Sequence, residues 1–276
     1  MSDANVAAPS PTARPPRANR ASAYAIQLWG VAGAEITKLR HDPIELVSRA
    51  IQPVLWLVLF GQVMGRVRGM NTGGVSYEDF LAPGILAQSV LFAAIFYGIA
   101  AIWERDLGTL QRYLVSPAPR SALIAGKTIS AAVRGLVQGF IVYFIALAIG
   151  TKLSLNPLHM LGAAVFIALG SGLFSTFSLI IACLVRTRER FMGIGQVLTM
   201  PIFFASNAIY PLDLMPRWLQ LVSHVNPLTY QVDALRTLML RGADSTIGLA
   251  TDFAVLALVT LCLTAIAARL YPRMGT

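Results

Sequence analysis

The feature that most constrains this chain is a series of six apolar segments, each long enough to cross a bilayer. A helix needs about 20 mostly apolar residues to span the hydrocarbon core. Segments of that kind recur at 44–64, 80–102, 129–149, 158–185, 191–209 and 247–271. Charged residues make up 13% of the chain, about half the roughly 25% usual for a soluble domain. The sequence therefore predicts an all-α integral membrane protein with six spans and excludes an ordinary water-soluble enzyme.

The basic residues predict how these spans are oriented. The net charge is +9, and 16 of the 22 Lys and Arg residues fall on the side of the predicted topology that holds both termini. Because cytoplasmic segments carry the excess of Lys and Arg, both termini are predicted to be cytoplasmic, with the spans in the inner (plasma) membrane. A nucleic-acid-binding protein would carry its basic residues on a soluble domain, and the sequence contains none.

Two segments precede the first span. Residues 1–22 are rich in Pro and Arg and are predicted to form a disordered cytoplasmic tail. Residues 23–42 place Trp29 and Ile36 on an apolar helical face, with Lys38 opposite. This pattern predicts an amphipathic interfacial helix on the membrane surface, although a simple run-in to the first span also fits. Residues 43–276 then form the six-span transmembrane domain.

The connection between the second and third spans, residues 103–127, is long for a link inside a bundle. Leu107, Leu110 and Leu114 recur at helical spacing among polar residues, and Pro117 and Pro119 follow. These features predict a short amphipathic helix on the cytoplasmic side. Such a helix either presents a rigid, charged surface to a partner or merely joins two spans, and the pattern leaves both open.

The same connection ends in Gly126-Lys127-Thr128, which looks like the end of a phosphate-binding loop. That loop also requires a glycine five residues before Gly126, where this chain has Ser121. It requires a preceding strand as well, whereas Lys127 here opens an apolar span. The sequence therefore predicts no nucleotide site and no bound cofactor. The histidines and cysteines are scattered without metal-ligand spacing, so no metal site is predicted either.

The connection between the fifth and sixth spans, residues 210–246, is too apolar for a solvated loop. Its two apolar stretches, 216–222 and 228–240, are separated by Asn226-Pro227 and predict two short re-entrant helices in the outer leaflet. They form either an external gate or a packed cap.

Polar residues and small residues mark two of the spans. Gln196, Thr199 and Asn207 make the fifth span the most polar central helix, and Pro201 interrupts it. This span is the candidate for lining a substrate pathway, with ordinary interhelical hydrogen bonding as the alternative. In the third span, Gly135 and Gly139 form a small-xxx-small pair that permits close helix contact, of which dimer assembly would be one use.

Two of these stretches carry a family resemblance. Residues 103–127 resemble the cytoplasmic coupling segment in the membrane subunits of type-2 ATP-binding-cassette exporters, and residues 188–230 resemble a second family stretch. The chain is most similar to the permeases of the daunorubicin-resistance and nodulation type. The residues matching the coupling pattern are Glu104, Gly108, Thr109, Leu110, Leu114, Pro117, Arg120, Gly126 and Lys127.

The resemblance implies a complex of two membrane subunits, identical or paralogous, and two cytoplasmic ATPase subunits that bind the ATP-Mg. It implies that the interfacial helix and the coupling segment contact the ATPases, and that the short external helices shape the exit. The residues implied in coupling also include Asp106 and Arg112, and those implied in the external gate are Tyr210, Pro211, Trp218, Asn226, Pro227 and Tyr230.

The implied activity is outward transport of a hydrophobic drug, antibiotic or lipid-like substrate, with no enzymatic activity in this chain. A polysaccharide or lipid-linked glycan is the alternative substrate. A non-transporting membrane scaffold or channel is a further alternative. An integral-membrane enzyme is disfavoured, because the spans contain no recognisable catalytic motif or paired carboxylates.

Overall fold

The computed structural model of the chain describes residues 33, 37, 43–64, 75–108, 120–185, 187–242 and 245–271, with the backbone alone for 43–50 and 120–123. Across these ranges the regular secondary structure is helical, apart from one antiparallel bridge between Leu153 and Leu240. The elements in order are α2 (Pro43–Met64), α3 (Tyr77–Asp106), α5 (Arg120–Ile149), α6 (Pro157–Leu184), α7 (Arg188–Phe204), η1 (Leu212–Leu214), α8 (Arg217–Val225), α9 (Pro227–Met239) and α10 (Leu249–Leu270).

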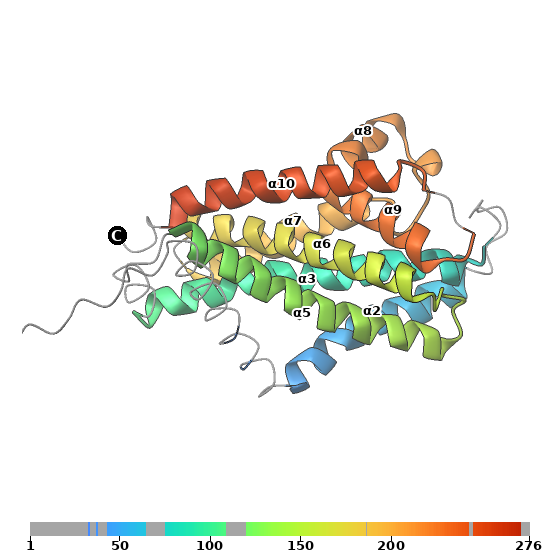
Figure 1. Cartoon of the computed structure of the whole chain (residues 1–276), viewed down its shortest axis with the longest axis horizontal. Helices are drawn as coiled ribbons and strands as arrows, with labels where there is room; N and C mark the ends of the chain where they lie inside the picture. Colours follow the sequence, from blue (N-terminus) through green and yellow to red (C-terminus); the bar gives the residue numbers. More distant parts are fainter. Residues whose placement is uncertain are drawn as a thin grey trace, which may run out of the picture.

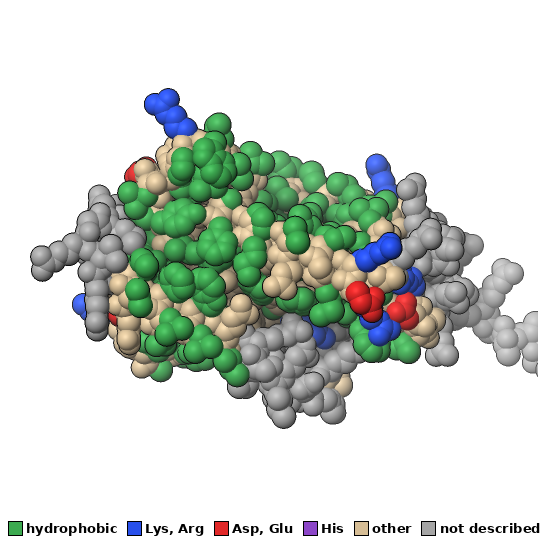
Figure 2. Space-filling view, turned by 180° about the vertical axis from the view of Figure 1, so that it is seen from behind, with side chains coloured by type: hydrophobic (Ala, Val, Ile, Leu, Met, Phe, Trp, Pro, Cys, Tyr) green, Lys and Arg blue, Asp and Glu red, His purple; other side chains and the backbone are tan. Residues whose placement is uncertain are grey.

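The long helices lie side by side along the long axis of the molecule, with α8 and α9 gathered toward one end (Figure 1). We call that end the Asp79 end, because α3 begins there. The Glu104 end is the opposite one, where α3 finishes. Figure 2 shows a surface that is hydrophobic across its middle, with Lys, Arg, Asp and Glu toward the two ends. This banded surface is typical of a protein that crosses a bilayer.

Among the residues that the structure describes, four helices are long and apolar enough to cross a membrane: α3, α5 from Ile124 onward, α6 and α10. They coincide with the predicted second, third, fourth and sixth spans. The apolar part of α2 whose side chains are described covers only Ile51–Met64, and α7 has 17 residues. The described part of the chain is thus built from helices, four of which can span a membrane, whereas the count of six spans stays a prediction.

Three predicted boundaries need correction. The second span continues to Asp106, so that Trp103 and Glu104 belong to α3 and not to a separate connecting helix. The third helix begins at Arg120, nine positions before the predicted start of its span. α7 ends at Phe204, because the turn at 205–208 replaces the last part of the predicted fifth span. Hydropathy marks the apolar part of a helix, whereas polar residues extend these helices beyond it.

The core lies around α3 and α6, whose most apolar windows are 72% and 67% buried, against 11% for α10. Small residues let these helices approach each other. A methyl group on Gly98 would overlap the Ser178 hydroxyl, and one on Gly135 would overlap Ser171. Gly139 faces Ile167 on the same neighbouring helix. The Gly135–Gly139 pair therefore serves packing of α5 on α6 within the chain.

The predicted interfacial helix lies almost wholly outside the described residues, Trp29, Ile36 and Lys38 included. Its two described positions, Gly33 and Thr37, are helical. The Thr37 hydroxyl donates to the Gly33 carbonyl at 2.9 Å, one helical turn away.

Candidate coupling site and the opposite end of the bundle

An ion pair between α3 and α5 is the central feature of the Glu104 end. The Lys127 ammonium donates to the Glu104 carboxylate, with Nζ and Oε2 2.6 Å apart. The two side chains are 7% and 14% exposed, respectively. A buried charge is costly unless it is paired, so this contact keeps the last turn of α3 against the start of α5. It also occupies the lysine of the Gly126-Lys127-Thr128 sequence.

A second cluster of charges joins the ends of α3, α6 and α7. The Arg188 guanidinium donates to Asp106 Oδ2 through Nε at 3.1 Å and Nη2 at 2.8 Å. Arg105 holds the other carboxylate oxygen of Asp106, at 3.1 Å, and donates to the Val185 carbonyl at 3.4 Å. The guanidinium carbon of Arg188 also lies 3.5 Å from the centroid of the Trp103 ring, where a cation–π interaction is favourable.

The structure places part of the predicted coupling segment. Glu104 and Asp106 lie in the clusters described above, and Gly108 follows α3 with a φ of +70°. Because L side chains avoid this conformation, a glycine suits the turn that ends the helix. Gly126 is buried in α5, and Arg120 begins it. Thr109, Leu110, Arg112 and Pro117 lie outside the described residues.

Trp103 and Arg188 were missed as site residues. Arg188 lies 82 positions from Asp106 in the sequence, and no local pattern connects the two. The only available signal was that Trp103 adjoins Glu104 and that Arg188 opens the second family stretch.

At the Asp79 end, the predicted short helices are present as α8 and α9. Asn226 separates them and caps α9, its side-chain oxygen accepting from the Leu228 amide at 3.0 Å, while Pro227 takes the first helical position. The Asn226 side chain also donates to the Ile202 carbonyl at 2.6 Å, which ties α9 to α7. α9 is therefore packed onto the bundle, whereas α8 lies against α9 and η1 and has Ser223 as its one buried residue.

The remaining predicted gate residues are bound to the backbone or exposed. Tyr210 donates to the Phe204 carbonyl and Tyr230 to the His224 carbonyl, each at 2.6 Å. Burial raises the pKa of the Tyr210 hydroxyl. Pro211 precedes the short helix η1, and Trp218 is 66% exposed on α8.

Arg236 of α9 is a functional candidate that the sequence did not reveal. Its guanidinium carbon lies 3.8 Å from the Phe80 ring centroid, and Nη2 donates to the Asn207 carbonyl at 2.7 Å. Burial lowers the pKa of this guanidinium to about 10, against the opposing effect of Asp233. The group therefore stays charged at neutral pH and holds α9, α3 and the turn after α7 together.

The predicted pathway residues do not share one surface. Gln196 is exposed on α7, Thr199 is buried on the same helix, and Asn207 is buried in the turn that follows it. The Thr199 hydroxyl donates to the Gly195 carbonyl of its own helix. Within the described ranges, no three metal-ligating side chains come together.

Comparison with known proteins assigns the family. Residues 26–240 match the profile described as the ABC-2 type transporter. The transport permease ycf38 of Cyanophora paradoxa is 33% identical over 208 residues, covering 73% of this chain and 70% of that protein. The daunorubicin resistance ABC transporter permease protein DrrB1 of Streptomyces coeruleorubidus is 25% identical over 226 residues, covering 82% and 78%.

Nodulation protein J of Rhizobium leguminosarum bv. trifolii is 29% identical over 197 residues, covering 71% of this chain and 74% of its own length. The family match extends from before α2 to the end of α9, so it includes both the charged clusters and the short helices. A multi-pass membrane protein with this profile partners an ATP-binding-cassette ATPase. The chain belongs to the ABC-2 type transporter family, as a permease subunit of an ABC transporter.

Proposed function

We propose that this chain is the membrane subunit of an exporter whose ATPase subunits dock at the Glu104 end. The observation that most supports this proposal is the buried Lys127–Glu104 ion pair, whose Nζ and Oε2 atoms are 2.6 Å apart. The Asp106–Arg188 pair forms at the same end of the bundle. Together these pairs link the ends of three helices, α3, α5 and α7, at one end of the bundle. A push on the segment that follows Glu104 would therefore move those helices as a unit. The bias of Lys and Arg supports a cytoplasmic position for this end and for both termini.

The proposed pathway lies between this chain and a second membrane subunit, along α2 and α7. Trp56 of α2 lies against Phe203 and Phe204, with ring centroids 6.1 and 6.4 Å apart, so the two helices are neighbours. Their exposed positions include three amides, Gln52, Gln62 and Gln196. An amide exposed to hydrocarbon costs free energy. This favours a face covered by a second subunit or lining a polar pathway over one that faces lipid alone.

The proposed substrate is a hydrophobic drug, antibiotic or lipid-like molecule. One relative, DrrB1, is named for daunorubicin resistance, which supports a drug over the alternative polysaccharide or lipid-linked glycan. The energy would come from ATP-Mg on the partner subunits, because the phosphate loop is incomplete at Ser121 and Lys127 is engaged by Glu104.

The test is reconstitution of the chain in liposomes with and without its ATPase. We expect no ATP hydrolysis by this chain alone, and ATP-dependent movement of a daunorubicin-like drug with the ATPase present. Glu104→Gln should lower transport more than ATP hydrolysis, because the ATPase would cycle without moving the spans. A chain that hydrolyses ATP alone, or a Glu104→Gln variant with normal drug movement, contradicts the proposal.

A matched control and a second substrate class complete the test. Arg217→Gln removes an exposed charge from α8, far from the Glu104 end, and should leave coupling unchanged. Movement of a lipid-linked glycan without movement of the drug would replace the proposed substrate by the alternative. Movement of neither in the presence of an active ATPase would favour a scaffold.

A further inference from the structure

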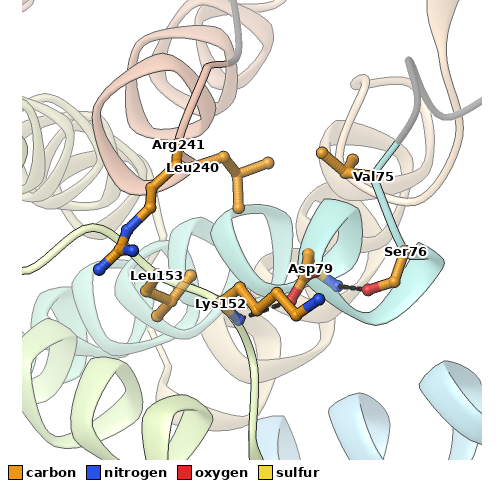
Figure 3. A pocket seen from close by; sticks show the side chains of 7 residues that line it. All are labelled: Val75, Ser76, Asp79, Lys152, Leu153, Leu240 and Arg241. Carbon is orange, nitrogen blue, oxygen red and sulfur yellow. Dashed lines mark hydrogen bonds between the residues drawn. The ribbon is translucent and has the colours of Figure 1, made fainter.

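A cavity of about 360 Å³ opens at the Asp79 end, away from the coupling site. Its lining comes from the start of α3, the link between α5 and α6, and the residues after α9 (Figure 3). The lining residues are Val75, Ser76, Asp79, Lys152, Leu153, Leu240 and Arg241. The cavity therefore combines an apolar wall with charged side chains.

The backbone brings the positions of two basic residues, Lys152 and Arg241, opposite each other at the edge of this cavity. Leu153 and Leu240 form an antiparallel bridge, and the Ser154 amide donates to the Met239 carbonyl at 2.6 Å. In an antiparallel pair the next positions outward also oppose one another, so Lys152 lies across from Arg241. Like charges directly opposite are destabilising, and Figure 3 shows the two side chains extending in opposite directions.

Neither cation has a charged partner among the residues that the structure describes. The one acidic residue in the lining, Asp79, is only 6% exposed. Its carboxylate accepts a hydrogen bond from the backbone amide of Lys152 at 2.7 Å, and its own backbone amide donates to the Ser76 hydroxyl. Asp79 therefore fixes the position of Lys152 and leaves a surplus of one positive charge in the cavity.

An exposed apolar stripe runs along α6, the helix that begins five residues after Lys152. Leu158, Leu161 and Val165 of this helix are 71%, 65% and 41% exposed. Their spacing places them in one stripe along the helix, and such a stripe in a membrane-spanning helix contacts acyl chains. A molecule with an anionic head and an apolar tail would match both surfaces at once.

We propose that this cavity binds the phosphate of a phospholipid headgroup, with its acyl chains along the exposed stripe of α6. On binding, the Lys152 and Arg241 side chains would turn toward the cavity and each donate to the phosphate oxygens, because ammonium and guanidinium groups form strong charge-assisted hydrogen bonds with phosphate. The bound anion would also relieve the repulsion between the two cations. This inference is independent of the transported substrate and of which membrane face the cavity meets.

The test is native mass spectrometry of the full-length chain, purified in detergent and titrated with phosphatidylglycerol. We expect the wild-type protein to retain the lipid, and Lys152→Gln/Arg241→Gln to retain it ~10-fold more weakly, since two charged donors are lost. Arg217→Gln is the control, because it removes one exposed cation from the same end of the molecule. Lys152→Arg/Arg241→Lys keeps both charges and should retain the lipid.

Two further probes distinguish the source of the phosphate. Diacylglycerol lacks the phosphate and should bind weakly to all variants, while inorganic phosphate should displace the lipid poorly because it cannot use the α6 stripe. Equal retention by the double glutamine variant, or equal loss in Arg217→Gln, would overturn the site. Displacement by inorganic phosphate at the lipid's own concentration would overturn its assignment to a lipid.

Discussion

Lys127 donates to Glu104 across a gap of 23 positions in the sequence, with 2.6 Å between Nζ and Oε2. The pair thus brings together the two ends of the connection whose pattern resembles a coupling segment. Both side chains are nearly removed from solvent. An ion pair of this kind fixes geometry more than it adds stability, since desolvation offsets much of the attraction. A rigid contact of this kind between α3 and α5 is what we expect if a displacement of one helix is to be transmitted to the other.

Breaking the pair should destabilise the protein strongly. Lys127→Met leaves the Glu104 carboxylate buried without its cation, which costs about 3–5 kcal/mol. Urea unfolding in detergent, followed by tryptophan fluorescence, measures the change. The double exchange Glu104→Lys/Lys127→Glu restores opposite charges and should recover part of the loss. An exchange variant no more stable than Lys127→Met would show that the contact is not what stabilises this end.

The Arg188 cluster should affect coupling more than stability. Arg188 and Asp106 are 33% and 36% exposed, and pairs this accessible to water contribute little to stability. Arg188→Lys keeps the charge but loses the paired donors and the flat contact with Trp103. We expect the free energy of unfolding to change little, while transport per ATP hydrolysed falls severalfold. An Arg188→Lys variant with normal transport per ATP hydrolysed would show that Arg188 does not help to transmit motion from the ATPase to the spans.

Four of the predicted spans coincide with described helices, and they were predictable because each is a property of one continuous stretch of sequence. The sequence placed the ends of α6 and α10 within two residues, since apolar runs there stop abruptly at polar residues. It also placed α8 and α9, because Asn226-Pro227 both ends one helix and starts the next. It failed for α3 and α5, where polar turns such as that of Trp103–Asp106 continue the helix beyond the apolar run.

Glycine contacts in the core predict a sharp contrast between two variants. A methyl group on Gly84 would overlap the backbone carbonyl of Ala208, which cannot move as a side chain can. Gly84→Ala should therefore destabilise by about 1–3 kcal/mol. At Gly195, a methyl group would lie 3.4 Å from the Ile95 side chain, in ordinary contact, and a helical Gly→Ala change there gains up to about 1 kcal/mol. Equal effects in thermal unfolding would contradict the packing.

Asp233 should control the turn before α10. Its carboxylate accepts hydrogen bonds from the Ser245 hydroxyl, the Thr246 hydroxyl and amide, and the Ile247 amide. Asp233→Asn replaces one acceptor oxygen by a donor, so we expect about 2 kcal/mol of destabilisation and faster hydrogen exchange at Thr246 and Ile247. Asp213→Asn, at an exposed position in η1, serves as the control and should change exchange there very little.

The charged contacts between distant segments could not be predicted in the same way. Asp106 and Arg188, or Arg236 and Phe80, meet only after several helices have packed. Each residue alone fits an ordinary membrane-interface position, where Arg is common. The cation pair at Lys152 and Arg241 depends on a single bridge between Leu153 and Leu240. That bridge leaves no periodic pattern in either segment, because it involves one residue from each.

The proposed arrangement of two membrane subunits makes a crosslinking prediction. Cys183→Ala/Cys262→Ala removes both native thiols, and Gln196→Cys then places one thiol on the exposed face of α7. If α2 and α7 face the second subunit, mild oxidation should join two chains into a covalent dimer, provided that the partner is a second copy. Leu258→Cys, on the 62% exposed face of α10, is the control and should stay monomeric because lipid covers that face. Gel electrophoresis without reductant gives the answer, and a dimer from Leu258→Cys but not from Gln196→Cys would move the interface to α10.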